Sequence, residues 1–265
     1  MVLDPDLGDH VCLPYGNERE RLDATRTLAA NGLRRRVKVM IITHTDTPEA
    51  TRAWLGFTEA EAAGRLEILA GGDTHFVDGR LDPARVLGAL AAAGEQARKQ
   101  GYAGLYLLVD ASWGLRDAAG HARLEAATNA LCAEGWLAVV CQYDRTLFCG
   151  ADLDRAACVH PISPDQAMLR FAGTCRPAGL RISGEIDLTN RDAFASILAT
   201  LESEAAQVVI DATGLDYMDA GAAQLLAATA SARGARGTVI TCQEPIARLL
   251  HLVRADEVIT VRDHD

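Results

Sequence analysis

The stretch AQVVIDATGLDYMDAGAAQLLAAT, residues 206–229, predicts a strand, a turn and a helix in one continuous run. Residues 208–210 form a β-branched apolar run closed by an aspartate, which is typical of a strand buried on both faces. Gly214 predicts a turn after that strand. Asp219 predicts the N-cap of a helix over residues 220–232, because its carboxylate can accept hydrogen bonds from the first helical amides.

The start of this helix is the first candidate binding surface. A helix N-terminus presents unpaired amides and the positive end of the helix dipole, so anions, phosphoryl groups or side chains of a partner can dock there. We therefore predict four partner-binding residues: Asp219, Ala220, Gly221 and Ala222.

Two further stretches extend the pattern, GLRISGEIDLTNRDAF at residues 179–194 and TVITC at residues 238–242. Together the three stretches resemble the STAS domain of anti-sigma factor antagonists, in which a buried strand ends in Asp and Asp-Ser-Ser/Thr-Gly opens the next helix. The resemblance implies a partner protein such as an anti-sigma factor of the histidine-kinase-like ATPase type. Aligned without a gap, the family's phosphorylated Ser falls on Gly221 and the preceding residue on Ala220, and neither carries a hydroxyl. We therefore predict that the usual phosphorylation switch is absent.

The composition is that of a two-domain protein without nucleic-acid or membrane partners. A chain of 265 residues, 49% hydrophobic and 23% charged, is long enough for two ordinary domains. The net charge of −10 argues against nucleic acid, because phosphate neutralisation needs clustered Lys and Arg. The chain has neither a signal-like start nor a run of about 18 apolar residues, so we expect a cytoplasmic protein. The seven cysteines are odd in number and are expected to be reduced thiols.

In the first half of the chain, strands alternate with helices. Because neighbouring parallel strands need crossover connections, the alternation predicts a doubly wound, mostly parallel α/β sheet. A polar loop is expected at residues 71–79, and residues 144–160 show only weak periodicity. The expected strands are residues 37–43, 66–69, 104–113 and 137–143, and the expected helices are residues 17–32, 47–55, 59–63, 117–134 and one that opens at residue 82.

Two prolines in residues 160–164 discourage a helix and mark a boundary between domains at residues 1–163 and 164–265. The second domain is expected to be a smaller α/β domain. It begins with paired strands, followed by helices, and ends in an edge strand. The predicted ranges are residues 167–174 and 179–186 for the paired strands, 191–203 and 244–253 for two helices, and 258–261 for the last strand.

His10-x-Cys12-x-x-Tyr15 is the first candidate for chemistry in the first domain. Alternation along a strand puts His10 and Cys12 on the same face. They are candidates to bind a metal, a haem or a small ligand, or alternatively to pack as a buried thiol beside a hydrogen-bonded imidazole. The spacing alone favours packing, because two residues do not make a closed metal site.

The carboxyl ends of two strands carry the second and third candidates. Asp110, Ser112 and Trp113 close one strand, and ligands of open α/β sheets usually lie at such ends. The alternative is a helix-capping Asp and a core Trp. The next strand ends in CQYDR, whose Asp144 and Arg145 are either an ion pair or a ligand clamp.

Cys158-x-His160 is the fourth candidate, with the spacing of His10-x-Cys12 and the reverse order of the two residue types. The two pairs together have the ligand types of a Cys2His2 zinc or iron site. The alternative for His160 is a loop that Pro161 stiffens. We predict no metal site, since nothing in the sequence shows that the pairs meet.

GDHVCLPY, LVDASWGL and VVCQYDRTLF, followed by His160-Pro161, together resemble the MEDS domain, the sensory domain of the dichloromethane regulator and related bacterial proteins. The resemblance implies a ligand-sensing role and a RecA-like core without a working phosphate loop. The chain indeed has no Gly-rich loop followed by Lys-Ser/Thr, which argues against a P-loop hydrolase. The resemblance names no cofactor. The family's two motifs fall on His10, Cys12, Tyr15, Asp110, Ser112 and Trp113.

The sequence therefore predicts a bacterial signal-transduction protein with a role in transcription regulation, in which a sensor acts with a partner-binding STAS module and no catalysis is needed. One alternative is a sensor of a small molecule, nucleotide or metal whose STAS half serves as a dimerisation or scaffold module. A weaker alternative is an enzyme with Cys12 as nucleophile and His10 as base. We expect one shared ligand site at the carboxyl ends of the strands, with His10 within two side-chain lengths of Asp110. The predicted ligand-binding residues are His10, Cys12, Tyr15, Asp110, Ser112, Trp113, Asp144 and Arg145.

Overall fold

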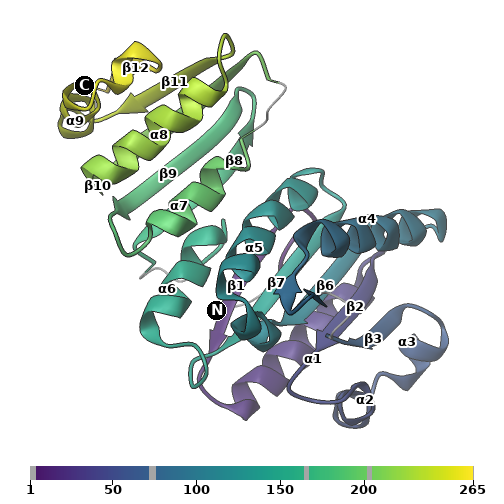
Figure 1. The fold of residues 1–265 in the computed structure, drawn as a ribbon. Coiled ribbons are helices and arrows are strands. Elements are labelled where there is room, and N and C mark those ends of the chain that lie inside the picture. Colours follow the sequence, from purple (N-terminus) through teal and green to yellow (C-terminus); the bar gives the residue numbers. More distant parts are fainter. Residues whose placement is uncertain (1–3, 72–75, 164–166, 202–204, 265) are drawn as a thin grey trace. The chain divides into compact units, whose positions relative to one another are not determined.

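Two β-sheets with flanking helices organise the chain in this computed structural model, which describes residues 4–71, 76–163, 167–201 and 205–264 (Figure 1). The chain divides into two units, residues 1–153 and 154–265, and each is described by itself. The boundary predicted after residue 163 comes later in the chain than this division. Among the described helices, none has the length and apolar character that crossing a membrane requires.

The sheet of the first unit has five strands, and all neighbouring pairs are parallel. Its spatial order is β1 (His10–Tyr15), β7 (Leu137–Asp144), β6 (Leu105–Asp110), β2 (Lys38–Thr43) and β3 (Leu66–Ala70). The crossover helices are α1 (Glu18–Arg34), α2 (Pro48–Leu55), α3 (Thr58–Ala62), α4 (Pro83–Lys99) and α5 (Ala118–Ala133). The predicted doubly wound parallel sheet is confirmed.

The two faces of this sheet are covered by different helices (Figure 1). Alternate strand residues such as Val11, Ile41 and Val140 pack with Leu28 of α1 and Leu55 of α2 in one buried cluster. The residues between them point to the other face, where α4 and α5 pack. We call these the α1 face and the α5 face.

Helix starts follow the capping signals of the sequence. Four polar residues directly before a helix accept a hydrogen bond from a backbone amide of its first turn, which satisfies a group that the helix itself leaves unpaired. They are Asn17 for α1, Thr47 for α2, Asp82 for α4 and Asp117 for α5.

The strand expected within residues 104–113 ends at Asp110, the residue predicted to lie at the carboxyl edge of the sheet. The Asp110 side chain caps a 3₁₀ helix, η2 (Ala111–Arg116), which agrees with the helix-capping alternative. Two local predictions between residues 71 and 160 are wrong. The segment with weak periodicity contains a helix, α6 (Gly150–Val159), with an exposed outer side that blurs its pattern. The described part of the predicted polar loop contains a short hairpin, β4 (Phe76–Val77) and β5 (Arg80–Leu81); residues 72–75 lie outside the described residues.

The second unit contains a mixed five-stranded sheet, in which the pair β8–β9 is antiparallel and the other pairs are parallel. Its order is β12 (Thr260–Asp263), β11 (Gly237–Cys242), β10 (Gln207–Met218), β9 (Ala178–Ile186) and β8 (Leu169–Cys175). The helices are α7 (Arg191–Leu198), α8 (Ala220–Ala232) and α9 (Glu244–Leu252), with a 3₁₀ turn, η3 (Ala255–Glu257). α7 is shorter than predicted, and residues 202–204 lie outside the described residues.

The turn predicted at Gly214 is wrong, because β10 continues through this residue to Met218. The pairing with β9 shifts register on both sides of Gly214, as at a β-bulge. A glycine inside a strand often marks a bulge rather than an end. The longer strand carries the chain directly to Asp219, which caps α8 as predicted.

Candidate ligand and partner sites

At the carboxyl edge of the first sheet, Asp110 holds the chain's own backbone. Its carboxylate accepts hydrogen bonds from the amides of Thr45 at 2.7 Å, Ser112 at 3.1 Å and His44 at 3.3 Å, and from the Ser112 hydroxyl. Burial alone would raise the pKa of this carboxyl, but the bonds from Ser112 and Thr45 outweigh burial and hold the pKa below its ordinary value. Asp110 therefore fastens the β2–α2 loop to the end of β6 and caps η2.

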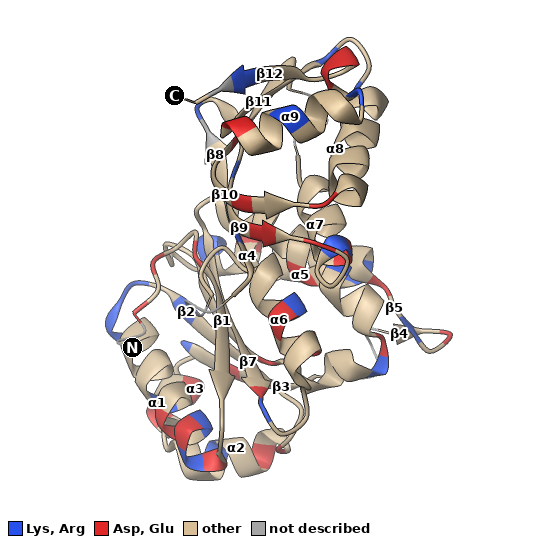
Figure 2. Cartoon of the chain, turned by 90° about the vertical axis from the view of Figure 1, so that its left-hand side faces the viewer, with Lys and Arg blue, Asp and Glu red and all other residues tan. Residues whose placement is uncertain are grey.

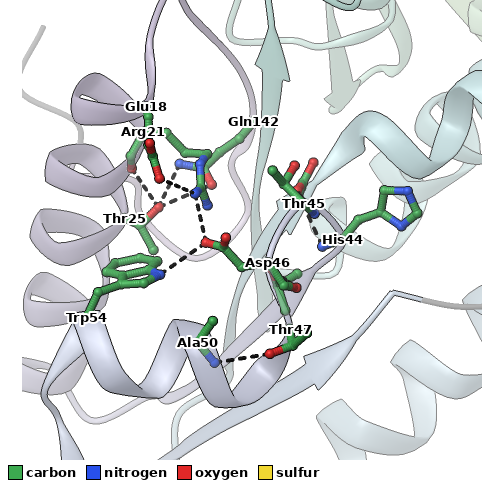
Figure 3. Close-up of polar contacts among 12 residues, drawn as sticks. Glu18, Arg21, Thr25, His44, Thr45, Asp46, Thr47, Ala50, Trp54 and Gln142 are labelled. Atoms are coloured by element: carbon green, nitrogen blue, oxygen red, sulfur yellow. Dashed lines mark hydrogen bonds and ion pairs between the residues drawn. The ribbon is translucent and has the colours of Figure 1, made fainter.

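Beside Asp110, a buried arginine and a tryptophan meet one carboxylate (Figure 3). Arg21 is 5% exposed, and its Nη2 lies 2.8 Å from Asp46 Oδ2, to which Trp54 Nε1 also donates at 3.1 Å. Thr25 and Gln142 are hydrogen-bonded to each other in the same view. The charge of Arg21 is thus neutralised by Asp46, a pair that the sequence did not predict.

The remaining predicted residues at this edge also have structural roles. Tyr15 is buried, and burial followed by the charges of Asp110 and Asp144 raises its pKa above the ordinary value. Asp144 accepts from both the amide and the hydroxyl of Thr146, which closes a tight turn. Arg145 is exposed, and its amide donates to the Tyr15 carbonyl.

The start of α1 does not offer its amides to a phosphate. Gly16 N donates to Glu20 Oε2 at 2.7 Å, and Glu20 N donates to Asn17 Oδ1 at 3.0 Å, so the helix start is closed by its own side chains. Glu18 and Glu20 also place negative charge in the first turn. A phosphate would have to displace these contacts and approach two carboxylates, which disfavours nucleotide binding at this position.

On the α5 face, four polar side chains surround the buried carboxylate of Glu125. His10 Nε2 lies 3.1 Å and Cys141 Sγ 3.3 Å from Oε2, while His121 Nε2 lies 2.7 Å and Tyr143 Oη 3.1 Å from Oε1. The other nitrogen of His10, Nδ1, lies 2.8 Å from the side-chain oxygen of Asn129, so Asn129 joins the set through His10. We call this set the Glu125 cluster: His10, His121, Glu125, Asn129, Cys141 and Tyr143.

Burial keeps the thiol and the phenol of the Glu125 cluster protonated. Glu125 is 5% exposed, and His10 and Tyr143 are fully buried. Burial, and after it the charge of Glu125, raises the pKa of the Cys141 thiol and of the Tyr143 phenol well above their ordinary values. Both groups therefore keep their protons at neutral pH and face the carboxylate.

The prediction of one shared site is wrong, because the sheet separates its members. The strand register places Asp110 level with Leu13, which lies beyond His10 on β1, two strands away. This corresponds to about 10 Å along the sheet and about 10 Å across it. His10 and Cys12 point to the α5 face, whereas Tyr15 and Asp110 lie on the α1 face.

Trp113 is the predicted residue that reaches the α5 face from the carboxyl edge. It follows Asp110 in η2, and its ring packs against the His121 ring at a centroid distance of 5.3 Å. His10 uses its ring nitrogens in the Glu125 cluster, which does not favour its prediction as a base for Cys12.

In the second unit, the start of α8 is occupied by an arginine. Asp219 Oδ1 accepts from the amide of Ala222 at 2.7 Å, and Oδ2 pairs with Arg191 Nη2 at 2.5 Å. A Cβ on Gly221 would lie 2.5 Å from Arg191 Cζ, so the glycine leaves the space in which the guanidinium lies. Ala220 is exposed, but the Ala222 methyl is fully buried. The prediction that Ala222 is part of the partner-binding surface is therefore wrong.

Residues 9–161 match the family model described as MEDS, the methanogen/methylotroph DcmR sensory domain. The chain belongs to the MEDS family. Residues 169–260 match a second model, described as "Mlab, STAS domain", so the two domains follow one another in the predicted order. A MEDS sensory domain with a STAS domain indicates a signalling or regulatory role. None of the curated proteins matches the chain.

Cys158 and His160 end the MEDS match and are both buried. Burial raises the pKa of the Cys158 thiol to about 11, and the thiol packs in the core of the second unit. His160 Nδ1 lies 2.7 Å from the Ala156 carbonyl. That Cys158 and His160 form no metal site with His10 and Cys12 stays a prediction.

Glu125 was not predicted from the sequence of the MEDS unit, although a signal for it exists. His121, Glu125 and Asn129 recur at intervals of four residues, a spacing that puts them on one face of α5. That face also carries Leu124, Thr128 and Cys132, which are buried, so polar residues on it had to point into the protein. No comparable spacing in the sequence predicted Arg191, the ion-pair partner of Asp219.

Proposed function

We propose that the MEDS unit receives a chemical signal and that the STAS unit transmits it by binding a partner protein, without a catalytic step. The observation that supports this function best is the surface at the start of α8. Leu188 after β9 is 74% exposed and Tyr217 at the end of β10 is 50% exposed. Ile186 pairs with Met218, so β9 and β10 end at the same edge of the sheet. The side chains of Leu188 and Tyr217 therefore lie at the edge where α8 starts. Exposed apolar side chains beside a polar anchor are typical of docking surfaces.

The helix behind this surface suits close approach by a partner. α8 carries no charged residue along residues 220–232, and its ribbon is tan throughout in Figure 2. Small side chains at its start allow another backbone to come near, while Asp219 and Arg191 supply a polar rim. The proposed partner is an anti-sigma factor of the histidine-kinase-like ATPase type, as the STAS resemblance suggests, and the proposed location is the cytoplasm.

Partner binding is tested with one substitution made at two exposed leucines. Leu188→Asp places a charge on the proposed surface, and Leu252→Asp, at an 82% exposed position on α9, is the matched control. The purified full chain is titrated against candidate anti-sigma factors. We expect Leu188→Asp to raise Kd at least about tenfold, as for a residue in an interface centre, and Leu252→Asp to leave it unchanged. Equal effects of the two variants would contradict the assignment of the surface.

We further propose that phosphorylation at the start of α8 does not switch this binding. Residues 220–222 offer no hydroxyl, and Arg191 already pairs with the cap carboxylate at that place. Incubation with candidate kinases and ATP should leave the intact mass unchanged. A phosphate mapped to Thr213 or Tyr217 would show that the switch has moved.

A gain-of-function variant checks the same point. Gly221→Ser restores the hydroxyl, but its Cβ needs the space of the Arg191 guanidinium, so we pair it with Arg191→Ala. The double variant is expected to accept a phosphate and then to lose the partner, because the added charge repels and must be desolvated. Arg191→Ala alone is the control.

The alternative function is a small-molecule sensor whose STAS unit serves as a dimerisation module. A cavity of about 30 Å³ on the α5 face, beside Trp113, Glu125 and Cys141, favours a very small ligand within the MEDS unit. Native mass decides between the two functions. A stable dimer that binds none of the candidate anti-sigma factors supports the alternative.

A further inference from the structure

The Glu125 cluster contains three potential metal ligands of different chemistry that converge on one point. His10 Nε2, Glu125 Oε2 and Cys141 Sγ are separated from one another by 3.1 Å, 3.3 Å and 3.5 Å. All three belong to a group of buried metal-ligating side chains within the described residues. We propose that His10, Glu125 and Cys141 bind one transition-metal ion of the Zn²⁺ class.

The separations match the geometry of such an ion. With bonds of about 2.0–2.3 Å to nitrogen, oxygen and sulfur, the donors around a tetrahedral ion lie about 3.3–3.6 Å apart. The three observed distances are close to this range, so the ion would fit after shifts of a few tenths of an ångström. A thiolate with an imidazole selects zinc-like ions over Mg²⁺ or Ca²⁺, which prefer oxygen.

The surrounding side chains orient the ligands as in metal sites. Ligating histidines usually hold their other ring nitrogen on an acceptor, and His10 Nδ1 lies 2.8 Å from Asn129 Oδ1. The second carboxylate oxygen of Glu125 accepts a hydrogen bond from Tyr143 at 3.1 Å, and His121 Nε2 lies 2.7 Å from it. The ligand atoms therefore come from three elements, β1, α5 and β7, and are fixed by packing rather than by mobile loops.

Binding must release a proton. Cys141 can bind the ion only as a thiolate, so the proton of its thiol has to leave. The ion replaces the proton on sulfur, and the proton passes to solvent. The charge of the carboxylate and the thiolate together balances that of a divalent ion, which makes a buried charged cluster sustainable.

A tetrahedral ion takes a fourth ligand besides these three side chains. The cavity of about 30 Å³ beside Glu125 and Cys141 is large enough for one water-sized ligand. It is otherwise lined mainly by apolar residues such as Leu107, Val109 and Val139.

The test is a Co²⁺ titration of the full chain after treatment with a chelator. Wild-type protein should bind one Co²⁺ per chain, with thiolate-to-cobalt absorption in the near ultraviolet, release a proton, and yield the ion to Zn²⁺. Cys141→Ser should lose the absorption and weaken binding at least about tenfold. Cys242→Ser is the matched control, since this thiol is equally buried but lies in the STAS unit.

A second variant separates metal binding from folding. Tyr143→Phe keeps the ring and all three ligands but removes the hydroxyl that orients Glu125, and should weaken Co²⁺ binding about 10–100-fold at unchanged stoichiometry. Circular dichroism confirms that each variant is folded. A folded wild type that takes up no Co²⁺ or Zn²⁺, or a Cys141→Ser protein that binds as the wild type does, would overturn the proposal. Neither outcome bears on partner docking by the STAS unit.

Discussion

Asp110→Asn tests whether the carboxylate at the end of β6 is a structural anchor. One carboxylate oxygen accepts from the amides of His44 and Thr45, and the other accepts from the amide and the hydroxyl of Ser112. Asparagine keeps one acceptor and turns an NH₂ group toward the other pair of donors. The Ser112 hydroxyl can rotate to accept, but a backbone amide loses its partner.

The expected loss in free energy of unfolding follows from these hydrogen bonds. A buried amide without an acceptor costs about 1–3 kcal/mol, and the change from charge-assisted to neutral hydrogen bonds adds about 1 kcal/mol. Asp110→Asn should therefore lower the free energy of unfolding of the MEDS unit by about 2–4 kcal/mol. Asp144→Asn is the matched control on the neighbouring strand, where Thr146 uses a single oxygen that asparagine retains, and it should cost below about 0.5 kcal/mol.

Urea unfolding followed by tryptophan fluorescence isolates the MEDS unit, because all three tryptophans, residues 54, 113 and 136, lie in it. The pKa of Asp110 is lowered in the folded chain, so its contribution is complete above the unfolded pKa of about 3.9 and is lost as the pH falls through the folded value. The difference in free energy of unfolding between wild type and Asp110→Asn should be largest near pH 7 and should disappear in acid. Equal stability of the two aspartate variants at pH 7 would refute the anchor.

Further predictions concern packing. Gly94→Ala should destabilise the MEDS unit by about 1–3 kcal/mol, since the new Cβ would lie 2.0 Å from a ring carbon of Trp136; an unchanged urea midpoint would contradict this contact. Leu226→Ala, at a fully buried position of α8, should cost about 2–5 kcal/mol in the STAS unit, read by circular dichroism. Leu252→Ala, at a mostly exposed position, should change stability by no more than about 0.5 kcal/mol, and a similar loss in both leucine variants would count against the core assignment.

Strands and helix starts could be predicted from sequence because their causes are local. The strand predicted at residues 37–43 and the caps at Thr47, Asp82 and Asp219 need only neighbouring residues. The structure has the strand at residues 38–43 and the three caps as predicted. Gly214 shows the limit of such rules. A glycine fits both a turn and a bulge, and the pairing of β10 with β9, which is not local, decides for the bulge.

The prediction of one shared ligand site was wrong for a reason that is visible in the sequence. In His10-x-Cys12-x-x-Tyr15, the first two residues are two apart and the third is five beyond His10, so alternation puts Tyr15 on the opposite face of a strand. A short motif can therefore supply two different clusters. Glu125, by contrast, meets His10 and Cys141 only through the packing of α5 on β1 and β7, which no local pattern specifies.

The two faces of the sheet nevertheless meet in one short element. Asp110 caps η2 and anchors the β2–α2 loop on one side, and three residues later Trp113 packs on His121, which contacts Glu125 on the other. A change at the Glu125 cluster that moved His121 would press on Trp113 and hence on the residues that Asp110 fastens. Because packed contacts of this kind shift between discrete arrangements rather than stretch, η2 is the element through which an event in the buried cluster would reach the carboxyl edge of the MEDS sheet.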